Sequence, residues 1–415
     1  MSMGRIFNIE LSVAISIFFF TCSSTLEGLL PTIAPSYSII CTFLRYLTAL
    51  HIVFYQWTHY HEFVIDKKFL FFFIIYSFYI LYDITLGLVY PLDDMLSVPD
   101  NVGDFLFRTI YIISLMICSK TIIEKISFKK IIIIFTVFCL IPALIYINIV
   151  GFETFQVINE ANREARFIGS LTFAYNCAFV LVMYVFFVKY IFKWKILNFI
   201  LLSVVLFCIG YIYLASTKRG PILWSIVSIL TCYFFQSKRS FKFFFKLFLF
   251  LVLFFIVGDY LLNALSQFAP YSIGRIHAMI YEGDTSHRLT TGDSDNGYVI
   301  AIKQFANAPF FGSYFRLITG GGSIFRGAYP HNLFLEFMIT MGLVGIIPIL
   351  IILRRALKGM YIVFKYNNNK NYLVCFIIFC ISFYTLMTTG TICLNPSFWI
   401  SLSLILVIPK LKCYE

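Results

Sequence analysis

The fold class is decided by stretches such as residues 69–90, FLFFFIIYSFYILYDITLGLVY, in which Asp83 is the one charged residue. Two lysines, Lys67 and Lys68, stand immediately before this run. A helix needs about 20 consecutive apolar residues to cross a bilayer, so the run has the length and composition of a membrane span. It is too long and too continuous for a strand of a membrane β-barrel. We therefore expect helices that satisfy their own backbone hydrogen bonds within the membrane.

The composition extends this conclusion to the whole chain of 415 residues. Hydrophobic residues make up 60% and charged residues 13%, and the mean hydropathy is +0.88. Because a soluble domain carries about 25% charged residues, this composition excludes a soluble globular protein. It also excludes a disordered chain, since so much apolar surface forces burial. We expect residues 1–415 to form a single polytopic membrane domain of the all-α class.

Twelve apolar runs follow one another along the chain, and we expect each to form a transmembrane helix. The runs are 6–24, 37–57, 69–90, 105–119, 131–151, 168–188, 196–215, 221–236, 247–265, 332–353, 372–392 and 396–409. The first run lacks a small-residue cleavage site and is followed by further spans, so it predicts a first span rather than a signal peptide.

The connections between these runs alternate in charge. One set, which includes Lys67, Lys68 and the tail lysines Lys410 and Lys412, is rich in lysine. Positive charge is retained in the cytoplasm, which predicts that both termini are cytoplasmic. The net charge of +12 is therefore a topology signal, and we expect no nucleic-acid partner. The opposite set contains one large outer loop, residues 266–330, and a connection of that length usually has a function.

Arginine predominates in the outer connections, where a forked guanidinium suits phosphate or carboxylate. Arg163 and Arg166 share one face if their segment is helical, and Asn176 follows in the next span. The alternative is an interfacial pair that balances Glu160 and Glu164.

A second outer segment, Ser216-Thr-Lys-Arg219-Gly220-Pro221, predicts a tight turn. Two cations beside a helix N-terminus form an anion site, which favours a functional Arg219. The alternative is that the two cations merely end two helices.

The segment Pro330-His331-Asn332 begins the span that follows the long loop. A helix N-terminus disfavours the cationic form of histidine, so His331 should be neutral and able to accept a proton. The alternative is an interfacial histidine bonded to backbone. Glu336, one turn after Asn332, could face the bundle and orient a partner, or pair structurally.

Metal and cofactor sites are not expected. Asp293-Ser-Asp295 resembles the metal-binding DxD of nucleotide-sugar transferases, but flanking glycines also make it a turn. The chain has no P-loop and no GxGxxG. The eleven cysteines show no CxxC or zinc spacing, and ten lie in apolar runs or directly beside one, as small hydrophobic residues.

Several motifs together resemble the O-antigen polymerase and O-antigen ligase superfamily. They are Pro330-His331-Asn332-Leu333 with Gly342 and Gly345, Asn307-Ala-Pro309-Phe-Phe-Gly312 with Arg288 upstream, Arg166-Phe-Ile-Gly169 with Asn176, and Ser216-Thr-Lys-Arg219-Gly220. This chain departs from the pattern in two places, because a lysine precedes Arg219 and Tyr175 stands where proline often precedes the asparagine.

The resemblance implies a metal-independent, inverting glycosyltransferase at the periplasmic face of a Gram-negative inner membrane. Its donor and acceptor would be undecaprenyl-diphosphate-linked oligosaccharides, and a chain-length regulator would be a further partner. His331 would deprotonate the attacking hydroxyl, and Arg166, Arg219 and Arg288 would bind the diphosphate and stabilise its departure. Four more residues are predicted to support the site: Asn332 and Asn176 belong to the motifs, and Arg163 and Glu336 are added from their helical spacing.

Three functions remain open on the sequence alone. The first choice is O-antigen polymerase, which lengthens the polymer on its lipid carrier. The nearest alternative is the ligase that transfers finished polymer to lipid A-core. A glycan-lipid flippase has a similar size, but the chain shows neither an internal repeat nor a line of midspan charges, and a flippase needs no large outer loop.

Overall fold

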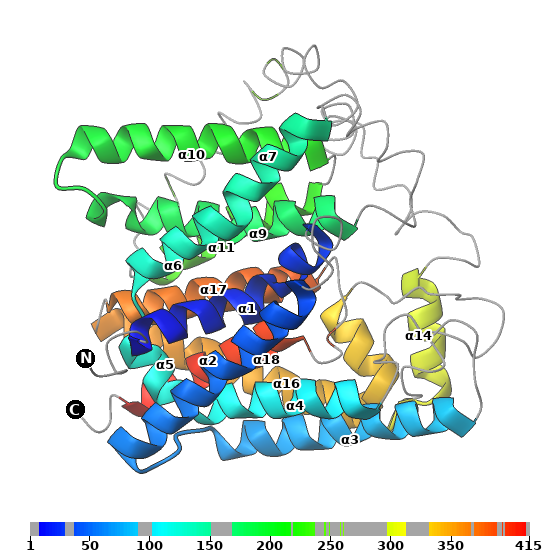
Figure 1. The fold of residues 1–415 in the computed structure, drawn as a ribbon. Helices are drawn as coiled ribbons and strands as arrows, with labels where there is room; N and C mark the ends of the chain where they lie inside the picture. Colours follow the sequence, from blue (N-terminus) through cyan, green and yellow to red (C-terminus); the bar gives the residue numbers. More distant parts are fainter. Residues whose placement is uncertain are drawn as a thin grey trace. The chain divides into compact units, whose positions relative to one another are not determined.

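The computed structural model describes residues 8–29, 37–89, 102–150, 168–216, 219–236, 297–312, 332–366, 369–387 and 395–411, and the single positions 245, 249, 258, 260 and 392. Every regular element among these residues is helical, which confirms the predicted class for this part of the chain (Figure 1). The elements are α1 (Ile9–Leu29), α2 (Tyr37–Tyr60), α3 (Lys67–Val89), α4 (Val102–Ile117), α5 (Ser119–Lys125), α6 (Phe128–Phe135), the π-helix η2 (Thr136–Leu140), α7 (Ile141–Val150), α9 (Ile168–Phe187), the 3-10 helix η3 (Val188–Tyr190), α10 (Lys195–Ser216), α11 (Arg219–Gln236), α14 (Gly297–Asn307), α16 (Leu333–Tyr366), α17 (Lys370–Leu386) and α18 (Pro396–Leu411).

The helices coincide with the predicted runs, with informative differences at their ends. The run 247–265 lies almost wholly outside the described residues. Helix α16 continues to Tyr366, past the predicted end at 353, because the cationic residues that follow are also good helix formers. Helix α14 lies within the long connection, where the pattern predicts no span.

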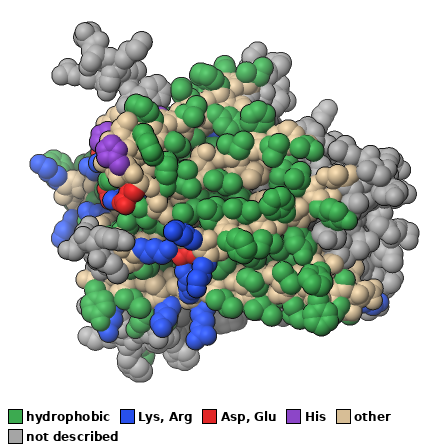
Figure 2. Space-filling model, turned by 90° about the horizontal axis from the view of Figure 1, so that it is seen from below, with side chains coloured by type: hydrophobic (Ala, Val, Ile, Leu, Met, Phe, Trp, Pro, Cys, Tyr) green, Lys and Arg blue, Asp and Glu red, His purple; other side chains and the backbone are tan. Residues whose placement is uncertain are grey.

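Within the described ranges, four helices are long and apolar enough to cross a membrane: Ile39–Tyr60, Phe128–Ile145, Lys195–Tyr213 and Leu333–Tyr366. The pair Phe105–Ile117 and Ser119–Lys125, bent by 63°, becomes a fifth if it forms one span. On the face in Figure 2, most charged side chains gather toward one side, and hydrophobic side chains cover much of the remaining described surface. These features are those of a helical membrane protein, while the number of twelve spans and the orientation remain predictions.

The chain divides into two compact units, of which the first comprises Met1–Ile52, Ile123–Asp284 and Phe364–Ile381. Helix α9 is the centre of this unit, since α1, α6, η2, α10 and α11 all pack against it. Its residues 174–184 are buried, including the small residues Ala174, Cys177 and Ala178. Small side chains allow helix backbones to approach closely, which is how helices associate in a membrane.

The second unit comprises Val53–Ile122, Thr285–Val363 and Ser382–Glu415. Its core is organised around Trp399 on α18, which is completely buried. The Trp399 ring lies 4.8 Å from that of Tyr76 and 4.9 Å from that of Phe73, both on α3, and 6.2 Å from that of Phe337 on α16. Edge and tilted aromatic pairs of this kind contribute about 0.5–1.5 kcal/mol each beyond burial, so the cluster joins three helices.

An ion cluster joins the same three helices at one end of the second unit. The Asp66 carboxylate caps α3 by accepting the Phe69 N–H at 3.0 Å, and it pairs with Arg355 of α16 at 2.6 Å and with Lys410 of α18 at 2.9 Å. Burial raises the pKa of the Asp66 carboxyl, but the Lys410 and Phe69 hydrogen bonds and the two positive charges outweigh it, so its pKa lies below the ordinary value. The cluster therefore holds the start of α3, the Arg355 position of α16 and the end of α18 together.

Candidate functional site

The structure describes the side chains of only some of the predicted site residues. Arg163, Arg166, Arg288 and His331 lie outside the described residues. Arg219 begins α11, as the turn motif predicts, and its side chain is not among those described. Three predicted supporting residues can be placed: Asn176, Asn332 and Glu336.

Asn332 begins α16 by capping it. Its Oδ1 accepts the N–H of Phe334 at 3.0 Å and the N–H of Leu335 at 3.2 Å. The first N–H groups of a helix have no partner within the helix, and an asparagine side chain supplies one. Asn332 is thus a structural cap, and it fixes the start of α16 directly after His331 in the sequence.

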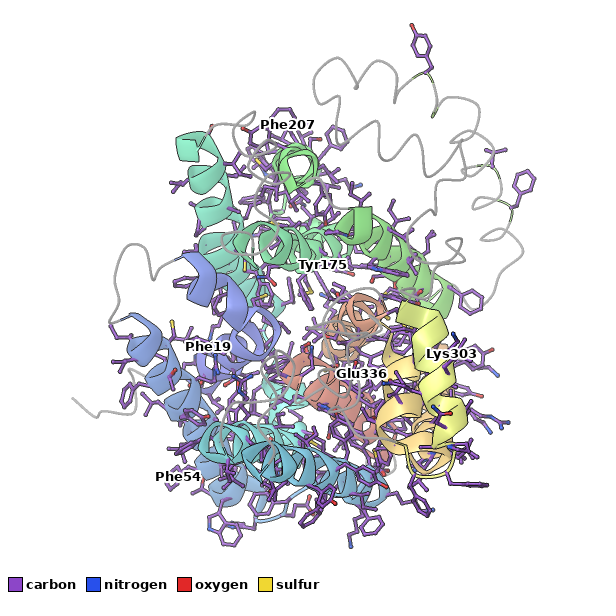
Figure 3. The ribbon with its side chains drawn as sticks, turned by 90° about the vertical axis from the view of Figure 1, so that its right-hand side faces the viewer. Phe19, Phe54, Tyr175, Phe207, Lys303 and Glu336 are labelled. Carbon is purple, nitrogen blue, oxygen red and sulfur yellow. The ribbon has the colours of Figure 1, made fainter. Side chains whose placement is uncertain are left out.

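Glu336 faces the interior of the second unit, where its side chain is completely buried. Figure 3 shows it enclosed among helices, whereas Lys303 on α14 lies at the periphery. Both carboxylate oxygens accept the backbone N–H of Ile392, at 3.1 and 3.0 Å. A buried carboxylate is costly unless it is hydrogen-bonded, so this contact explains how the position tolerates an acidic residue. Glu336 thus faces the interior and makes a structural contact with the backbone, and a role in orienting a partner stays a prediction.

Ile392, which precedes α18, is held through both its backbone groups. The Ile392 carbonyl accepts the indole N–H of Trp399 at 3.2 Å, while its N–H is bonded to Glu336. Asn395 then caps α18 by accepting the Phe398 N–H at 3.1 Å. The starts of α16 and α18 therefore form one hydrogen-bonded platform, next in sequence to His331.

Helix α16 is broken at Gly342, which has φ 61° and ψ −147°. Only glycine adopts this region without a large penalty. The break removes the intrahelical partners of the N–H groups that follow it. The Pro309 carbonyl accepts the Leu343 N–H at 2.8 Å, and the Phe310 carbonyl accepts the Val344 N–H at 3.2 Å. A turn of the long connection thus caps the second part of α16.

This docking requires two glycines. A Cβ on Gly342 would lie 2.6 Å from the Pro309 oxygen and 2.7 Å from the Gly312 nitrogen. Gly312 has φ 72°, and a Cβ there would collide with the backbone of Thr340 and Met341. The backbones of the turn and of α16 are therefore in direct contact, which a side chain at either position would prevent.

Asn176 lies in the first unit, on the central helix α9. Its side chain is 3% exposed, and its Nδ2 has no hydrogen-bond partner among the described residues. A buried amide donor without a partner costs about 1–3 kcal/mol, so it is poorly explained by packing alone. Asn176 therefore offers a donor that a ligand could use.

The described residues thus provide fixed polar groups in each unit, Asn176 in the first and the Glu336–Ile392 pair in the second. No group of three or more His, Cys, Asp and Glu residues that could bind a metal occurs in the described part of the chain. Sequence reasoning found Asn332 and Glu336 but missed Ile392, Trp399 and the Gly312–Gly342 contact. The two glycines were visible within short motifs, but nothing in a one-dimensional pattern indicates that they meet.

No protein-family model matches this sequence, and no curated protein matches it.

Proposed function

We propose that this protein is an O-antigen polymerase of the inner membrane that transfers an undecaprenyl-diphosphate-linked glycan onto a lipid-linked O-unit at the periplasmic face. The observation that supports the proposal most directly is the contact between Gly312 and Gly342. These glycines belong to two of the separate motifs that carry the resemblance, Asn307–Gly312 and the span after His331. Residues of two motifs that contact each other in the fold support the resemblance better than motifs that merely follow in the same order along the chain.

In the proposed reaction, His331 removes the proton from the acceptor sugar hydroxyl, whose oxygen attacks the anomeric carbon of the donor sugar. The bond from that carbon to the diphosphate oxygen breaks, and the electron pair leaves with undecaprenyl diphosphate. A single displacement inverts the anomeric configuration. Arg166, Arg219 and Arg288 are assigned to the departing diphosphate, because guanidinium groups stabilise such charge without a metal. The platform of Asn332, Glu336 and Ile392 would hold the chain next to His331.

The test is a gel of lipopolysaccharide from a strain that lacks only this gene. Core bearing a single O-unit supports the polymerase, because export and ligation then survive. Core without any O-unit contradicts it, and carrier-linked polymer accumulating outside would indicate the ligase instead. Core without O-unit and without external polymer would indicate the flippase.

Point variants in the same strain test the residue assignments. We expect His331→Ala to reproduce the deletion phenotype although the protein is present at the normal level in the membrane. Arg288→Lys keeps the positive charge but loses the forked guanidinium, so this variant should also make no polymer if the diphosphate is bound bidentately. Full-length polymer from His331→Ala would remove the base assignment, and full activity of Arg288→Lys would remove Arg288 from the site.

A further inference from the structure

The turn Ala308–Gly312 belongs to a connection between spans, yet it contacts α16 far from the end of that helix. The depth of this contact can be measured along α16 from the Asp66 cluster. Thirteen residues separate Gly342 from Arg355, which is about 20 Å at the helical rise of 1.5 Å per residue. The hydrocarbon core of a bilayer is about 30 Å thick. With the ion cluster at one boundary of the hydrocarbon core, Gly342 lies roughly 10 Å inside the opposite boundary.

Helix α18 is anchored at the same ion cluster. Its Lys410 is held by the same Asp66, and the helix has 16 residues, about 24 Å. It too ends before the far boundary. By the length measured along α16, the non-helical backbone at Gly342 lies within the thickness of the bilayer.

Several backbone groups of the turn are paired within the protein, as a membrane environment favours. The Gly312 N–H donates to the Ala308 carbonyl at 3.0 Å, and the Ala308 N–H donates to the Gln304 carbonyl at 3.2 Å. The Pro309 and Phe310 carbonyls accept from α16, as described above. Unpaired backbone groups cost several kcal/mol in hydrocarbon, so these four bonds lower the cost of placing the turn there.

The side chains of the turn extend an apolar surface of α16. Phe310 is 64% exposed and Phe311 is 66% exposed. Val344, Ile347 and Ile351 occupy one stripe of α16 and are 40%, 49% and 55% exposed. Because the Val344 N–H is bonded to the Phe310 carbonyl, the two apolar surfaces are continuous. An exposed apolar stripe on a helix that can span the membrane faces acyl chains by default. The side chains of the turn continue this stripe.

We propose that Ala308–Gly312 is a re-entrant segment, held below the membrane surface by its docking at Gly342, whose Phe310 and Phe311 side chains contact the fatty-acyl chains of bilayer phospholipids. Lys303, which is exposed on α14, would extend its ammonium group to the headgroup level while its stem stays in the apolar layer. Part of the connection 266–330 would then lie in the bilayer. The proposal does not depend on the polymerase reaction, because it concerns the position of the turn alone.

The experiment measures the depth of the turn in full-length protein reconstituted into phosphatidylethanolamine and phosphatidylglycerol vesicles. Phe311→Cys is labelled with an uncharged bimane, and the quenching of its fluorescence by phospholipids brominated on the acyl chain is recorded. Ile347→Cys on the α16 stripe is the lipid-facing control, and Glu62→Cys in the exposed α2–α3 connection is the water-facing control. The wild-type protein, treated in parallel, gives the background from the native cysteines.

We expect bimane at position 311 to be quenched as strongly as at position 347, and Phe311→Cys to resist a charged maleimide supplied on both sides of the membrane. Labelling by the maleimide to the extent seen for Glu62→Cys would overturn the proposal, because the turn would lie in water. Protection without quenching would overturn it as well, since a protein surface rather than lipid would then cover the turn.

A second variant tests the docking. Gly342→Ala combined with Phe311→Cys should lower the quenching and raise the reactivity with maleimide, because the added Cβ displaces the turn. Gly210→Ala is the matched control, since a Cβ there meets nothing within 4 Å. Unchanged quenching in folded Gly342→Ala protein would show that the docking does not hold the turn at its depth.

Discussion

Gly312 and Gly342 meet backbone to backbone, although they lie in different elements of the second unit. Each has a positive φ, and each occupies a position where a Cβ would collide with the main chain of the other segment. Between them, two carbonyls of the turn cap two N–H groups of α16 that the helix break leaves without partners. The long connection and the broken helix therefore stabilise each other.

Gly312→Ala should destabilise the folded protein by about 2 kcal/mol or more, since it combines an unfavourable φ with a backbone collision. The melting temperature of detergent-solubilised protein measures this loss. Gly210→Ala, in the interior of α10, should be neutral or stabilising by up to about 1 kcal/mol. Equal melting temperatures for the two variants would contradict the tight contact at Gly312.

Glu336→Leu should destabilise the second unit by about 1–3 kcal/mol, because the buried Ile392 N–H loses its acceptor. Glu336→Gln should cost less, since the amide oxygen can still accept that bond. Thermal unfolding of the two variants gives the order. Thr340→Val is the control one turn further along α16, where the hydroxyl only bonds back to the Glu336 carbonyl at 2.7 Å. If Glu336→Leu were as stable as the wild type, the platform would not rest on this carboxylate.

Asp66→Asn should cost about 1–2 kcal/mol at neutral pH, a range that allows for the partial exposure of Arg355 and Lys410. Asparagine keeps the α3 cap, so the loss reports the ion pairs. Glu62→Gln, which breaks the exposed pair with Lys120, is the control and should cost less than about 0.5 kcal/mol.

The Asp66 contribution should also depend on pH. The folded-state pKa lies below the ordinary value of 3.8, so the stabilisation is complete above that value and is lost as the pH falls through the folded pKa. The difference in melting temperature between wild type and Asp66→Asn should stay constant near neutrality and shrink below about pH 3.8. A difference that disappeared between pH 7 and 5 would contradict the lowered pKa.

Asn176→Leu should leave thermal stability unchanged or raise it, because it removes a buried donor that has no partner among the described residues. If the donor serves the substrate, polymer extension should nevertheless fall about tenfold to a hundredfold, the equivalent of one hydrogen bond to a charged group. Ser228→Ala removes a comparable buried hydroxyl on α11 and should retain activity. A stable Asn176→Leu variant with full activity would make Asn176 a packing residue.

Hydropathy predicted the helices well because the membrane imposes a simple rule. Apolar length and intrahelical hydrogen bonding are both local properties, so the runs 69–90 and 196–215 reappear as α3 and α10 with small shifts at their ends. The cap at Asn332 and the inward position of Glu336 are also local properties. The cap depends on where the helix starts, and the direction of Glu336 depends on the rotation of 100° per helical residue.

The pattern missed elements whose cause is non-local. Helix α14 is short and carries polar residues, so no span is expected there, and its turn is positioned by α16. The 63° bend between α4 and α5 and the break at Gly342 fall inside or beside apolar runs that continue without a signal. A glycine in such a run is compatible with an ordinary helix, and only the approach of another backbone makes it a break.

The sequence by itself determined that this is a helical membrane protein and where the described helices lie along the chain, and it predicts which residues could bind a diphosphate or accept a proton. Those conclusions follow from solvation and local geometry, which each segment carries alone. Tertiary structure alone decided that Gly312 docks on Gly342, that Glu336 binds Ile392, and that Asp66 unites three helices. Such contacts depend on which distant backbones approach each other, and this is a property of the packed chain rather than of any one segment.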